Sequence, residues 1–563
     1  MSRLTKIESQ VASELGAASR GGRIDGWLVA ALAIAALAGL PILAVLASAP
    51  SGGLDAILHL ASTVLPRYTA NTALLMLLAG GLAGLVGTGC AWLVTAAEFP
   101  GRRVLSWALV LPLAVPAYIA AYIYADLLDF GGPVQSGLRM VTGWEAGEYW
   151  FPQIRSLYGG AFVLGIVLYP YVYLLARAAF AAQSRAQFKA ARSLGAAPGR
   201  AFTRVALPAA RPAIAGGLAL VLMEVLADFG VADYFAIPTF STGIFRSWLL
   251  MGDKLAAMKL AAMMLVFVIA LIALEMRTRK GRSDSRDGLA AGAGEPLVRL
   301  TPAGKLLAFL ACLLPVLLGF VLPAAYLGWL ASGDAAIAAI GDLWTYASGS
   351  LWLGLATSLT CLVTALLLVF AKARTDTRIV GGAIRVATLG YALPGALLAV
   401  GLLAPLGAFD VALTRFARDS LGYGGGLLLT GTSLILIYAL SVRFLTVAYN
   451  SVDGGMSKIP RNLDAAARSL GAEPRRVLTR IYIPLLRPSL LAAAALVFID
   501  TVRELPATLI LRPFNLETLA TRTYRLASDE RLVEASIPAL ILLAAGLLPV
   551  LLLNRLDRQK VSG

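Results

Sequence analysis

The stretch KAARSLGAAPGRAFTRVALP, from Lys189 to Pro208, returns later in the chain as AAARSLGAEPRRVLTRIYIP, from Ala465 to Pro484. The two copies are identical at 12 of 20 positions, and Gly195 and Gly471 lie 276 positions apart. A fixed long period is the mark of an internal duplication. The spacing therefore predicts a chain made of two related halves.

The repeated polar stretch stands out because most of the chain is apolar. Of 563 residues 59% are hydrophobic and 14% are charged, against about 25% charged residues in ordinary soluble domains. Apolar runs of about 20 residues, enough to cross a bilayer as a helix, recur along the chain. The predicted spans are 26–48, 71–95, 104–127, 158–182, 210–228, 256–276, 304–329, 351–371, 382–406, 425–448, 485–503 and 534–554.

The position of the positive charge predicts the topology. The net charge is +16, and Lys and Arg concentrate before the first span, between the sixth and seventh spans, and after the last. With an even number of spans these segments share one side, which the positive-inside rule assigns to the cytoplasm. We therefore expect cytoplasmic N- and C-termini and no nucleic-acid partner. The first apolar run could also be taken for a signal peptide, but its length favours an uncleaved span.

The division that follows is an all-α membrane protein with two parallel six-helix repeats. An even number of spans in each half makes the copies parallel, related by an axis along the membrane normal. The predicted segments are a cytoplasmic N-terminal segment (1–25), a first repeat (26–276) with a cytoplasmic loop at 184–208, a cytoplasmic linker (277–303), a second repeat (304–554) with a cytoplasmic loop at 455–484, and a cytoplasmic tail (555–563). The same 276-residue register pairs Glu224 with Asp500, Asp228 with Glu504, Arg246 with Arg522, Trp248 with Tyr524 and Asp253 with Asp529.

The repeated loop is predicted to form a helix, a sharp turn and a second helix. Good helix formers precede Gly195, which suits a left-handed residue after a helix, and Pro198 suits the first turn of the next helix. Pro208 and Pro212 are expected to end the loop and begin the fifth span. Two other interpretations are an amphipathic hairpin lying on the lipid surface, and glycines that only permit close helix packing.

These residues resemble the cytoplasmic "EAA" loop of ABC importer permeases, whose short helix docks on an ATP-binding subunit. The resemblance assigns ATPase coupling to Ala190, Ala191, Arg192, Ser193, Leu194 and Gly195, and to Ala466, Ala467, Arg468, Ser469, Leu470 and Gly471. The family's leading Glu is replaced by Lys189 and Ala465. This departure affects any salt bridge made by that Glu, but not the shape of the loop.

Longer stretches resemble the fused, two-half permeases of ferric iron importers. They are YPYVYLLARAAF from Tyr169, ADFGVADYFAIPTFSTGIFRSW from Ala227 and ELPATLILRPFNLETLATRTY from Glu504. The resemblance implies the bacterial inner membrane, two copies of an ATPase subunit that carries ATP and Mg, an extracytoplasmic binding protein, and no cofactor on this chain. Permeases for thiamine and polyamines share the architecture, so these cargoes stay open.

Motifs for other functions are missing from the sequence. The chain has no G-x-x-x-x-G-K-[ST] phosphate loop, no H-E-x-x-H and no G-x-S-x-G, which argues against an ATPase or a membrane enzyme. Cys90, Cys312 and Cys361 lie in apolar runs without metal-type spacing, so buried free thiols are expected. An ion-coupled secondary transporter is the alternative from another class, but it has no evident use for a duplicated docking loop.

Four carboxylates are the candidate substrate pathway. Glu224 and Asp228, and Asp500 and Glu504, stand four residues apart in or at the end of predicted spans, and each pair is expected to share a helix face. Ionisable groups inside a membrane usually mark a pathway. Glu224 and Asp500, the deeper pair, are expected to bind a hard cation transiently. The alternatives are that Arg503 neutralises Glu504 and that Asp228 caps a helix.

Two arginines are the candidate contacts for the binding protein. Arg246 and Arg522 fall in extracytoplasmic loops of the two halves, and Arg is well suited to pairing with carboxylates. The alternative is an internal salt bridge to Asp253 or Asp529, each seven residues further on.

Overall fold

The computed structural model describes residues 26–48, 58, 60–145, 147–183, 185–280, 298–375, 377–422, 424–460, 463, 469 and 474–562. Within these residues, eleven helices are long and apolar enough to cross a membrane, and the number is twelve if one bent helix pair is counted as a span. The predicted all-helical fold with about twelve spans is confirmed. The N-terminal segment 1–25 and most of the linker lie outside the described residues.

The helices of the first half follow the predicted spans closely. They are α2 (Gly26–Ser48), α4 (Leu65–Ala96), α5 (Arg102–Ala108), η1 (Leu111–Ala114), α6 (Ala117–Leu128), α7 (Pro133–Thr142), α8 (Leu157–Ala182), α9 (Arg185–Ser193), α10 (Pro198–Ala201), η2 (Phe202–Ala206), α11 (Leu207–Ala227), α12 (Gly230–Tyr234), α13 (Phe240–Phe245), η3 (Arg246–Leu250) and α14 (Lys254–Lys280).

The second half repeats this order of elements. It contains α15 (Pro302–Val316), η4 (Leu317–Val321), α16 (Leu322–Ala331), α17 (Asp334–Ala338), η5 (Ala339–Asp342), α18 (Leu343–Arg374), α19 (Arg378–Ala387), η6 (Thr388–Ala392), α20 (Gly395–Leu421), α21 (Leu434–Met456), α23 (Pro474–Val477), η7 (Leu478–Tyr482), α24 (Ile483–Arg503), α25 (Pro506–Leu511), α26 (Leu519–Ser528) and α27 (Leu532–Ser562).

The third span of each half is broken, where the sequence predicted continuous helices over 104–127 and 382–406. In the first half the chain bends by 91° between Arg102–Ala114 and Ala117–Thr142. The break falls at Pro116, and the preceding Val115 is extended. Pro394 and the extended Leu393 repeat this arrangement in the second half. A proline drives the residue before it out of the helical region, which explains both breaks.

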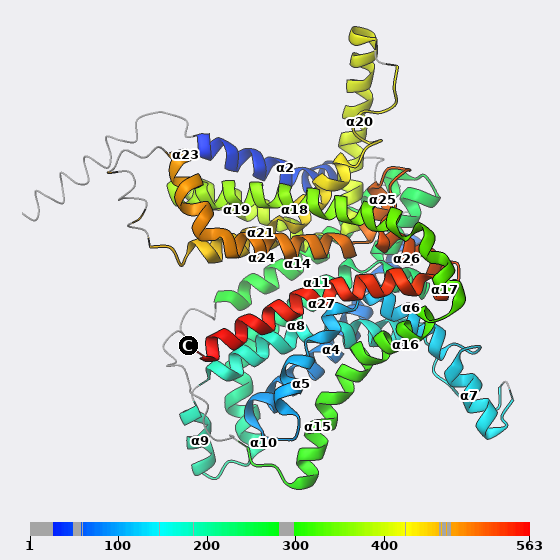
Figure 1. Cartoon of the computed structure of the whole chain (residues 1–563), viewed down its shortest axis with the longest axis vertical. Helices are drawn as coiled ribbons and strands as arrows, with labels where there is room; N and C mark the ends of the chain where they lie inside the picture. Colours follow the sequence, from blue (N-terminus) through cyan, green and yellow to red (C-terminus); the bar gives the residue numbers. More distant parts are fainter. Residues whose placement is uncertain are drawn as a thin grey trace, which may run out of the picture.

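The first span of each half packs against the other half. Helix α2 lies beside α18 and α19 (Figure 1), and Trp27 makes an edge contact with Phe370 of α18 with ring centroids 4.7 Å apart. In exchange, α15 packs on α4 and α5, and the Cys90 thiol contacts the carbonyl of Ala311 at 3.6 Å. The repeats defined by sequence are therefore exchanged in space at their first helices.

Small residues allow the spans to approach closely. Helix α4 packs along α8, and a Cβ added at Gly87 would lie 2.8 Å from the carbonyl oxygen of Tyr169. Membrane helices use such small residues because close backbone contact replaces the hydrophobic driving force that lipid does not provide. Cys90, Cys312 and Cys361 are buried and free, as predicted.

Three extra residues shift the register of the repeat near the end of each half. Asp228 and Glu504 occupy equivalent positions 276 residues apart, but the matching capping boxes at Thr239 and Thr518 lie 279 residues apart. The insertion lies between α25 and α26. The predicted pairings of Arg246 with Arg522, Trp248 with Tyr524 and Asp253 with Asp529 are therefore wrong, because Arg246 corresponds to Arg525.

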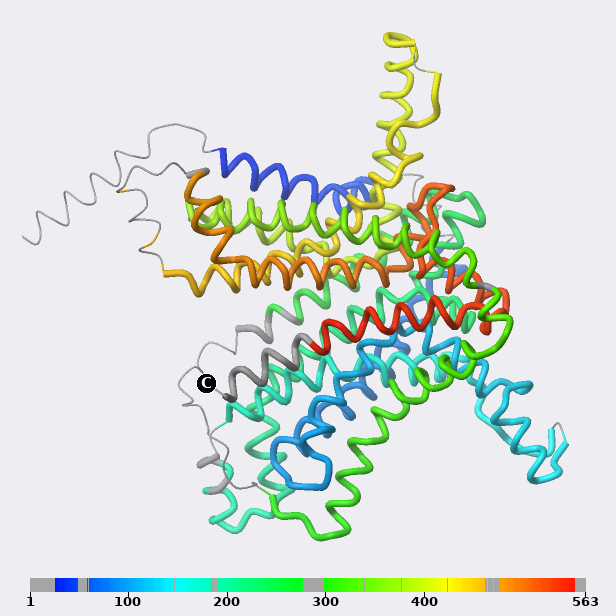
Figure 2. The backbone as a smooth tube through the Cα atoms, viewed as in Figure 1, coloured from blue at the N-terminus to red at the C-terminus, as the bar shows by residue number. Residues whose placement is uncertain are grey.

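The two ends of the helix bundle carry different elements. The short helices α9, α10 and α23 lie at one end, and α6, α17 and α26 lie at the other (Figure 1). Helix α20 leaves the bundle near the second end and runs sideways, across the direction of α2, α18 and α21 (Figure 2).

Candidate functional site

The first copy of the repeated loop ends its helix with a left-handed glycine. Gly195 has φ +85°. Its N–H donates to the carbonyl of Arg192, and the N–H of Ala196 donates to that of Ala191, both at 3.1 Å. This pattern is the Schellman motif, which satisfies the last carbonyls of a helix. The predicted turn is confirmed. A Cβ at Gly195 would meet nothing within 4 Å, so its backbone conformation, and not close packing, requires glycine.

The turn presents an apolar side chain to solvent. Leu194 is 88% exposed, and Ala190, Arg192 and Ser193 are also exposed, whereas Ala191 is half-buried. The rest of the described chain therefore leaves this turn uncovered. In the second copy, Ser469 is helical and exposed. Ala466, Ala467, Arg468, Leu470 and Gly471 lie outside the described residues.

An aromatic cluster fixes this loop to α4. The ring of Trp92 on α4 lies 5.4 Å from Phe188 of α9, 4.8 Å from Phe202 of η2 and 5.3 Å from Phe180 of α8. Rings at these separations attract one another beyond their burial. Trp92, which the sequence interpretation did not single out, thus joins the loop to a membrane span.

The fifth span begins earlier than predicted. The helix that starts at Pro198 continues through Pro208 and Pro212 to Ala227. A π turn over Phe202–Ala206 precedes Pro208, and the N–H of Leu207 donates to the carbonyl of Phe202. A π turn also precedes Pro484 in the second half. The extra residue in each turn accommodates the proline within a continuous helix, so these prolines do not end the loop.

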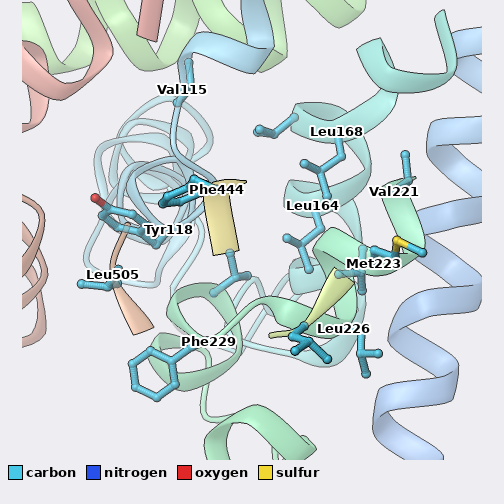
Figure 3. Close-up of a cluster of buried hydrophobic side chains, with 14 of the residues drawn as sticks. Val115, Tyr118, Leu164, Leu168, Val221, Met223, Leu226, Phe229, Phe444 and Leu505 are labelled. Carbon is cyan, nitrogen blue, oxygen red and sulfur yellow. The ribbon is translucent and has the colours of Figure 1, made fainter. Parts of the chain in front are cut away.

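A cavity of about 300 Å³ lies between the two halves. Its walls combine residues of α8, α11, α21, α24 and α27 with the break before α6 and with Tyr391 of η6, and all four predicted carboxylates line it. Figure 3 shows apolar parts of the wall, with Tyr118, Leu164 and Phe229 from the first half and Phe444 and Leu505 from the second. The duplication thus brings Glu224, Asp228, Asp500 and Glu504 to one place.

Asp228 and Glu504 cap short helices at the edge of this cavity. Asp228 follows the last residue of α11 and accepts hydrogen bonds from the N–H groups of Val231 at 3.5 Å and Ala232 at 3.0 Å. Glu504 accepts from the N–H groups of Ala507 and Thr508, both at 2.9 Å. These bonds satisfy the first donors of α12 and α25. The predicted alternative of a helix cap is therefore confirmed for Asp228 and extends to Glu504.

Glu224 and Asp500 lie one turn deeper, inside the last turns of α11 and α24. The phenol of Tyr391 donates to Glu224 at 3.4 Å, which joins η6 of the second half to α11 of the first. Both carboxylates line the cavity and are only partly buried. Of the four, this pair is therefore the better suited to meet a solute in the cavity.

Two arginines line the same cavity, and the sequence interpretation missed one of them. Arg443 Nη1 lies 3.6 Å from Glu504 Oε1. Arg503 donates to the carbonyl of Leu113 at 3.0 Å. The prediction that Arg503 neutralises Glu504 is wrong, since Arg443 is the ion-pair partner. Arg443 stood inside the predicted span 425–448, and an arginine in an apolar run is itself a signal of a buried function or partner.

The two predicted docking arginines lie at the end of the bundle opposite α9. Arg246 Nη2 lies 3.6 Å from Asp233 Oδ1. Asp253 instead accepts from the N–H of Ala256 at 2.9 Å, at the start of α14. The guanidinium of Arg522 lies over the ring of Tyr346 at 4.9 Å. Arg246 thus has an internal carboxylate partner, but it is Asp233 and not the expected Asp253.

Burial shifts the proton affinity of a tyrosine beside Arg246. The phenol of Tyr524 donates to Asp233 Oδ2 at 2.6 Å, and burial together with the Asp233 charge raises its pKa. Tyr524 therefore stays protonated and keeps donating.

Among the residues that the structure describes, no group of three or more His, Cys, Asp or Glu side chains is arranged to hold a metal ion.

Comparisons with known proteins agree with this geometry. The family described as "binding-protein-dependent transport system inner membrane component" matches twice, over residues 76–276 and 377–562. The "Fe(3+)-transport system permease protein FbpB 2" of Haemophilus influenzae is 25% identical over 86% of this chain and 89% of its own length.

Shorter parts of the chain are similar to permeases that are named for other substrates. The sulfate transport system permease protein CysT of Synechocystis sp. is 28% identical over 36% of this chain and 69% of its own length. The putative 2-aminoethylphosphonate permease PhnV of Salmonella typhimurium is 28% identical over 24% of this chain and 51% of its own length. Because the family model covers most of both halves, the chain belongs to the inner-membrane components of binding-protein-dependent transport systems, as a multi-pass permease that carries the family unit twice.

Proposed function

We propose that this permease imports ferric iron, in a complex with two copies of an ATPase subunit and one extracytoplasmic binding protein. The observation that carries the proposal is the cavity between the halves, where Glu224 and Asp500 from the two repeats line one space. Carboxylate oxygens are hard ligands, which suit a hard cation. The Haemophilus influenzae relative that aligns over most of the chain is named a ferric iron permease.

The coupling role rests on the rigid turn and its connection to α4. Leu194 and its neighbours at 190–195 form a docking surface for one ATPase subunit, and the second copy at 466–471 does the same for another. ATP and Mg are bound by those subunits. Closure of the ATPase pair on ATP pulls on both loops, and the Trp92 cluster carries the movement into the spans.

The orientation follows from the charges at the two ends. The loops, both termini and the linker face the cytoplasm, in agreement with the positive-inside rule. The opposite end then faces the binding protein, which Arg246 and Arg522 contact through its carboxylates. For Arg246 this contact competes with the pairing to Asp233.

Glu224 and Asp500 bind the cation transiently during transport. Two carboxylates can attract an ion without holding it tightly, whereas a resident site requires more ligands. The capping carboxylates Asp228 and Glu504 hold the ends of the pathway in shape. The halves alternate between states in which this pair faces one side of the membrane or the other.

An oxyanion importer is the second candidate. Arg443 and Arg503 line the same cavity, and arginines bind sulfate and phosphonate groups well. Relatives named for sulfate and 2-aminoethylphosphonate match parts of the chain. The two candidates differ in which set of side chains contacts the cargo.

The deciding experiment is uptake into proteoliposomes that contain the complete complex. Ferric iron, sulfate, 2-aminoethylphosphonate, thiamine and putrescine are compared in parallel, with ATP inside. Saturable, ATP-dependent uptake of iron is the expected result. Uptake of sulfate or 2-aminoethylphosphonate without iron overturns the iron assignment in favour of the arginines, and uptake of thiamine or putrescine alone overturns both.

A further inference from the structure

Helix α20 continues beyond the bundle as a lateral arm. Its first residues, 395–402, are buried, whereas most residues from 408 onwards are exposed. Figure 2 shows this second part extending sideways beside the end of α2, away from the region where the two halves meet. We call residues 408–421, with the returning segment 424–433, the α20 arm.

One buried carboxylate joins the two segments of the α20 arm. Asp410 is fully buried and accepts hydrogen bonds from the N–H groups of Leu428, Leu429 and Thr430 at 2.7–3.0 Å, and from the Thr430 hydroxyl at 2.7 Å. These bonds tie the returning segment to the helix. The α20 arm is therefore an ordered unit, because both carboxylate oxygens of Asp410 accept hydrogen bonds from the returning segment.

The remaining faces of the α20 arm differ in polarity. Phe409 is 57% exposed and Phe416 is 64% exposed, and Leu413 between them completes a stripe at helical spacing. Arg415 and Arg418 are exposed on another face. A helix that presents aromatic side chains on one side and cations on another is typical of one lying in a membrane interface.

The first half carries an arm at the corresponding place. Helix α7 follows the break at Pro116 as the distal part of α20 follows the break at Pro394, and it leaves the bundle on the opposite side (Figure 1). Met140 is 85% exposed and Val141 is 86% exposed. We call residues 130–145 and 147–150 the α7 arm.

The α7 arm is also fixed internally. Arg139 donates to the carbonyl of Phe130 at 2.9 Å, to the Tyr149 hydroxyl at 2.9 Å and to Ser136 Oγ at 3.1 Å. Its guanidinium lies over the Phe130 ring at 4.2 Å. Trp150, at the end of the arm, is 86% exposed. Tryptophan is enriched at membrane–water boundaries.

We propose that the two arms are lateral anchors in the lipid interface of the leaflet opposite the α9 loop. Phe409, Phe416, Met140 and Val141 enter the acyl boundary, and Arg415 and Arg418 face the phosphates and water. The spans also expose apolar side chains, which include Leu351, Leu355 and Leu359 on α18. They extend outward on opposite sides, whereas a protein docked over the cavity would sit between them.

The test measures the depth of single spin labels in proteoliposomes of phosphatidylethanolamine and phosphatidylglycerol. The full-length permease carries Phe416→Cys or, as a matched control two residues away, Arg418→Cys. Val141→Cys and Glu148→Cys form the second pair. The three native cysteines are buried, and the parent chain sets the labelling background. Power saturation with oxygen reports lipid exposure, and a nickel chelate reports water exposure.

We expect oxygen to relax the labels at positions 416 and 141 at least threefold more than the nickel chelate does. At positions 418 and 148 we expect the nickel chelate to relax the labels more than oxygen does. Accessibility to the nickel chelate at all four positions overturns the proposal. Protection of position 416 only after binding protein is added also overturns it, and assigns the arm to a protein partner. Neither outcome depends on the cargo, and gel filtration of each labelled variant verifies that it is folded.

Discussion

The phenolic oxygen of Tyr524 on α26 lies 2.6 Å from Asp233 on α12, so a hydrogen bond joins the second half to the first. Arg155 and Glu530 approach to 3.6 Å nearby and add a second link between the halves. Both contacts lie at the end of the bundle opposite the α9 loop. Any movement that separates the halves at that end must break them.

Removal of the Tyr524 hydroxyl is expected to ease this separation. A net hydrogen bond contributes about 1 kcal/mol, which corresponds to roughly a fivefold change in a two-state population. Tyr524→Phe should therefore raise ATP hydrolysis without binding protein by about fivefold. Tyr149→Phe is the matched control, because the Tyr149 hydroxyl donates to Gln135 within the first half. Equal rates in both variants would contradict the prediction.

Substitution of Gly195 should weaken coupling without affecting the membrane fold. A side chain at φ +85° costs about 1–2 kcal/mol, so Gly195→Ala is expected to reduce co-purification of the ATPase subunit and uptake together. Gly199→Ala is the control in the same loop, since Gly199 is helical and a Cβ there meets nothing within 4 Å. If Gly199→Ala has the same effect, the loop conformation is not the cause.

The deeper carboxylates should affect transport and leave stability unchanged. Glu224→Gln with Asp500→Asn removes two charges from the cavity while preserving side-chain volume. Uptake is expected to fall by at least tenfold, with unchanged expression and ATPase association. Full uptake, or loss of assembly, would remove these residues from the pathway.

The capping carboxylates should show the opposite behaviour. Glu504→Ala leaves the N–H groups of Ala507 and Thr508 without their acceptor, at a cost of about 1–3 kcal/mol. The midpoint of thermal unfolding in detergent should therefore fall. The midpoint of Glu504→Gln should fall less, because glutamine keeps an acceptor oxygen. Identical midpoints for the two variants would show that the cap contributes little.

The outer arginines can be tested through their salt dependence. Arg522→Gln removes one cation from the proposed docking face, where it lies over Tyr346. Association with the binding protein should weaken several-fold at low ionic strength and lose part of its salt dependence, because screening acts on exposed charges. Surface plasmon resonance at two salt concentrations provides the measurement. Unchanged affinity at low salt would argue against docking at this residue.

The repeated loop was predictable because its information is local. Gly195 must adopt a left-handed conformation whatever packs around it, and the spacing to Gly471 identified the duplication. The prolines were harder to interpret: Pro116 breaks its helix, whereas Pro208 lies in a continuous one behind a π turn. Hydropathy does not distinguish these two outcomes, because each depends on whether the packing of the neighbouring helices is compatible with a bend at the proline.

Other features depend on long-range packing. Helices α2 and α15 are both strongly apolar in sequence, so nothing local indicates which half each helix joins. The partner of Glu504 is Arg443, 61 positions earlier in the chain, whereas its neighbour Arg503 turns to the first half. The three extra residues between α25 and α26 were hidden because arginines happen to occur at both 522 and 525.

The exchange of first helices has a consequence for how the protein is made. Helix α2 leaves the ribosome before the surfaces it packs against, because α18 and α19 begin only at Leu343 and Arg378. Until the second half is synthesised, α2 has lipid as its only neighbour on that face. Helix α15 finds α4 and α5 already in place. The two halves therefore assemble in an unequal order, because the burial of α2 is completed only after α18 and α19 of the second half have been synthesised.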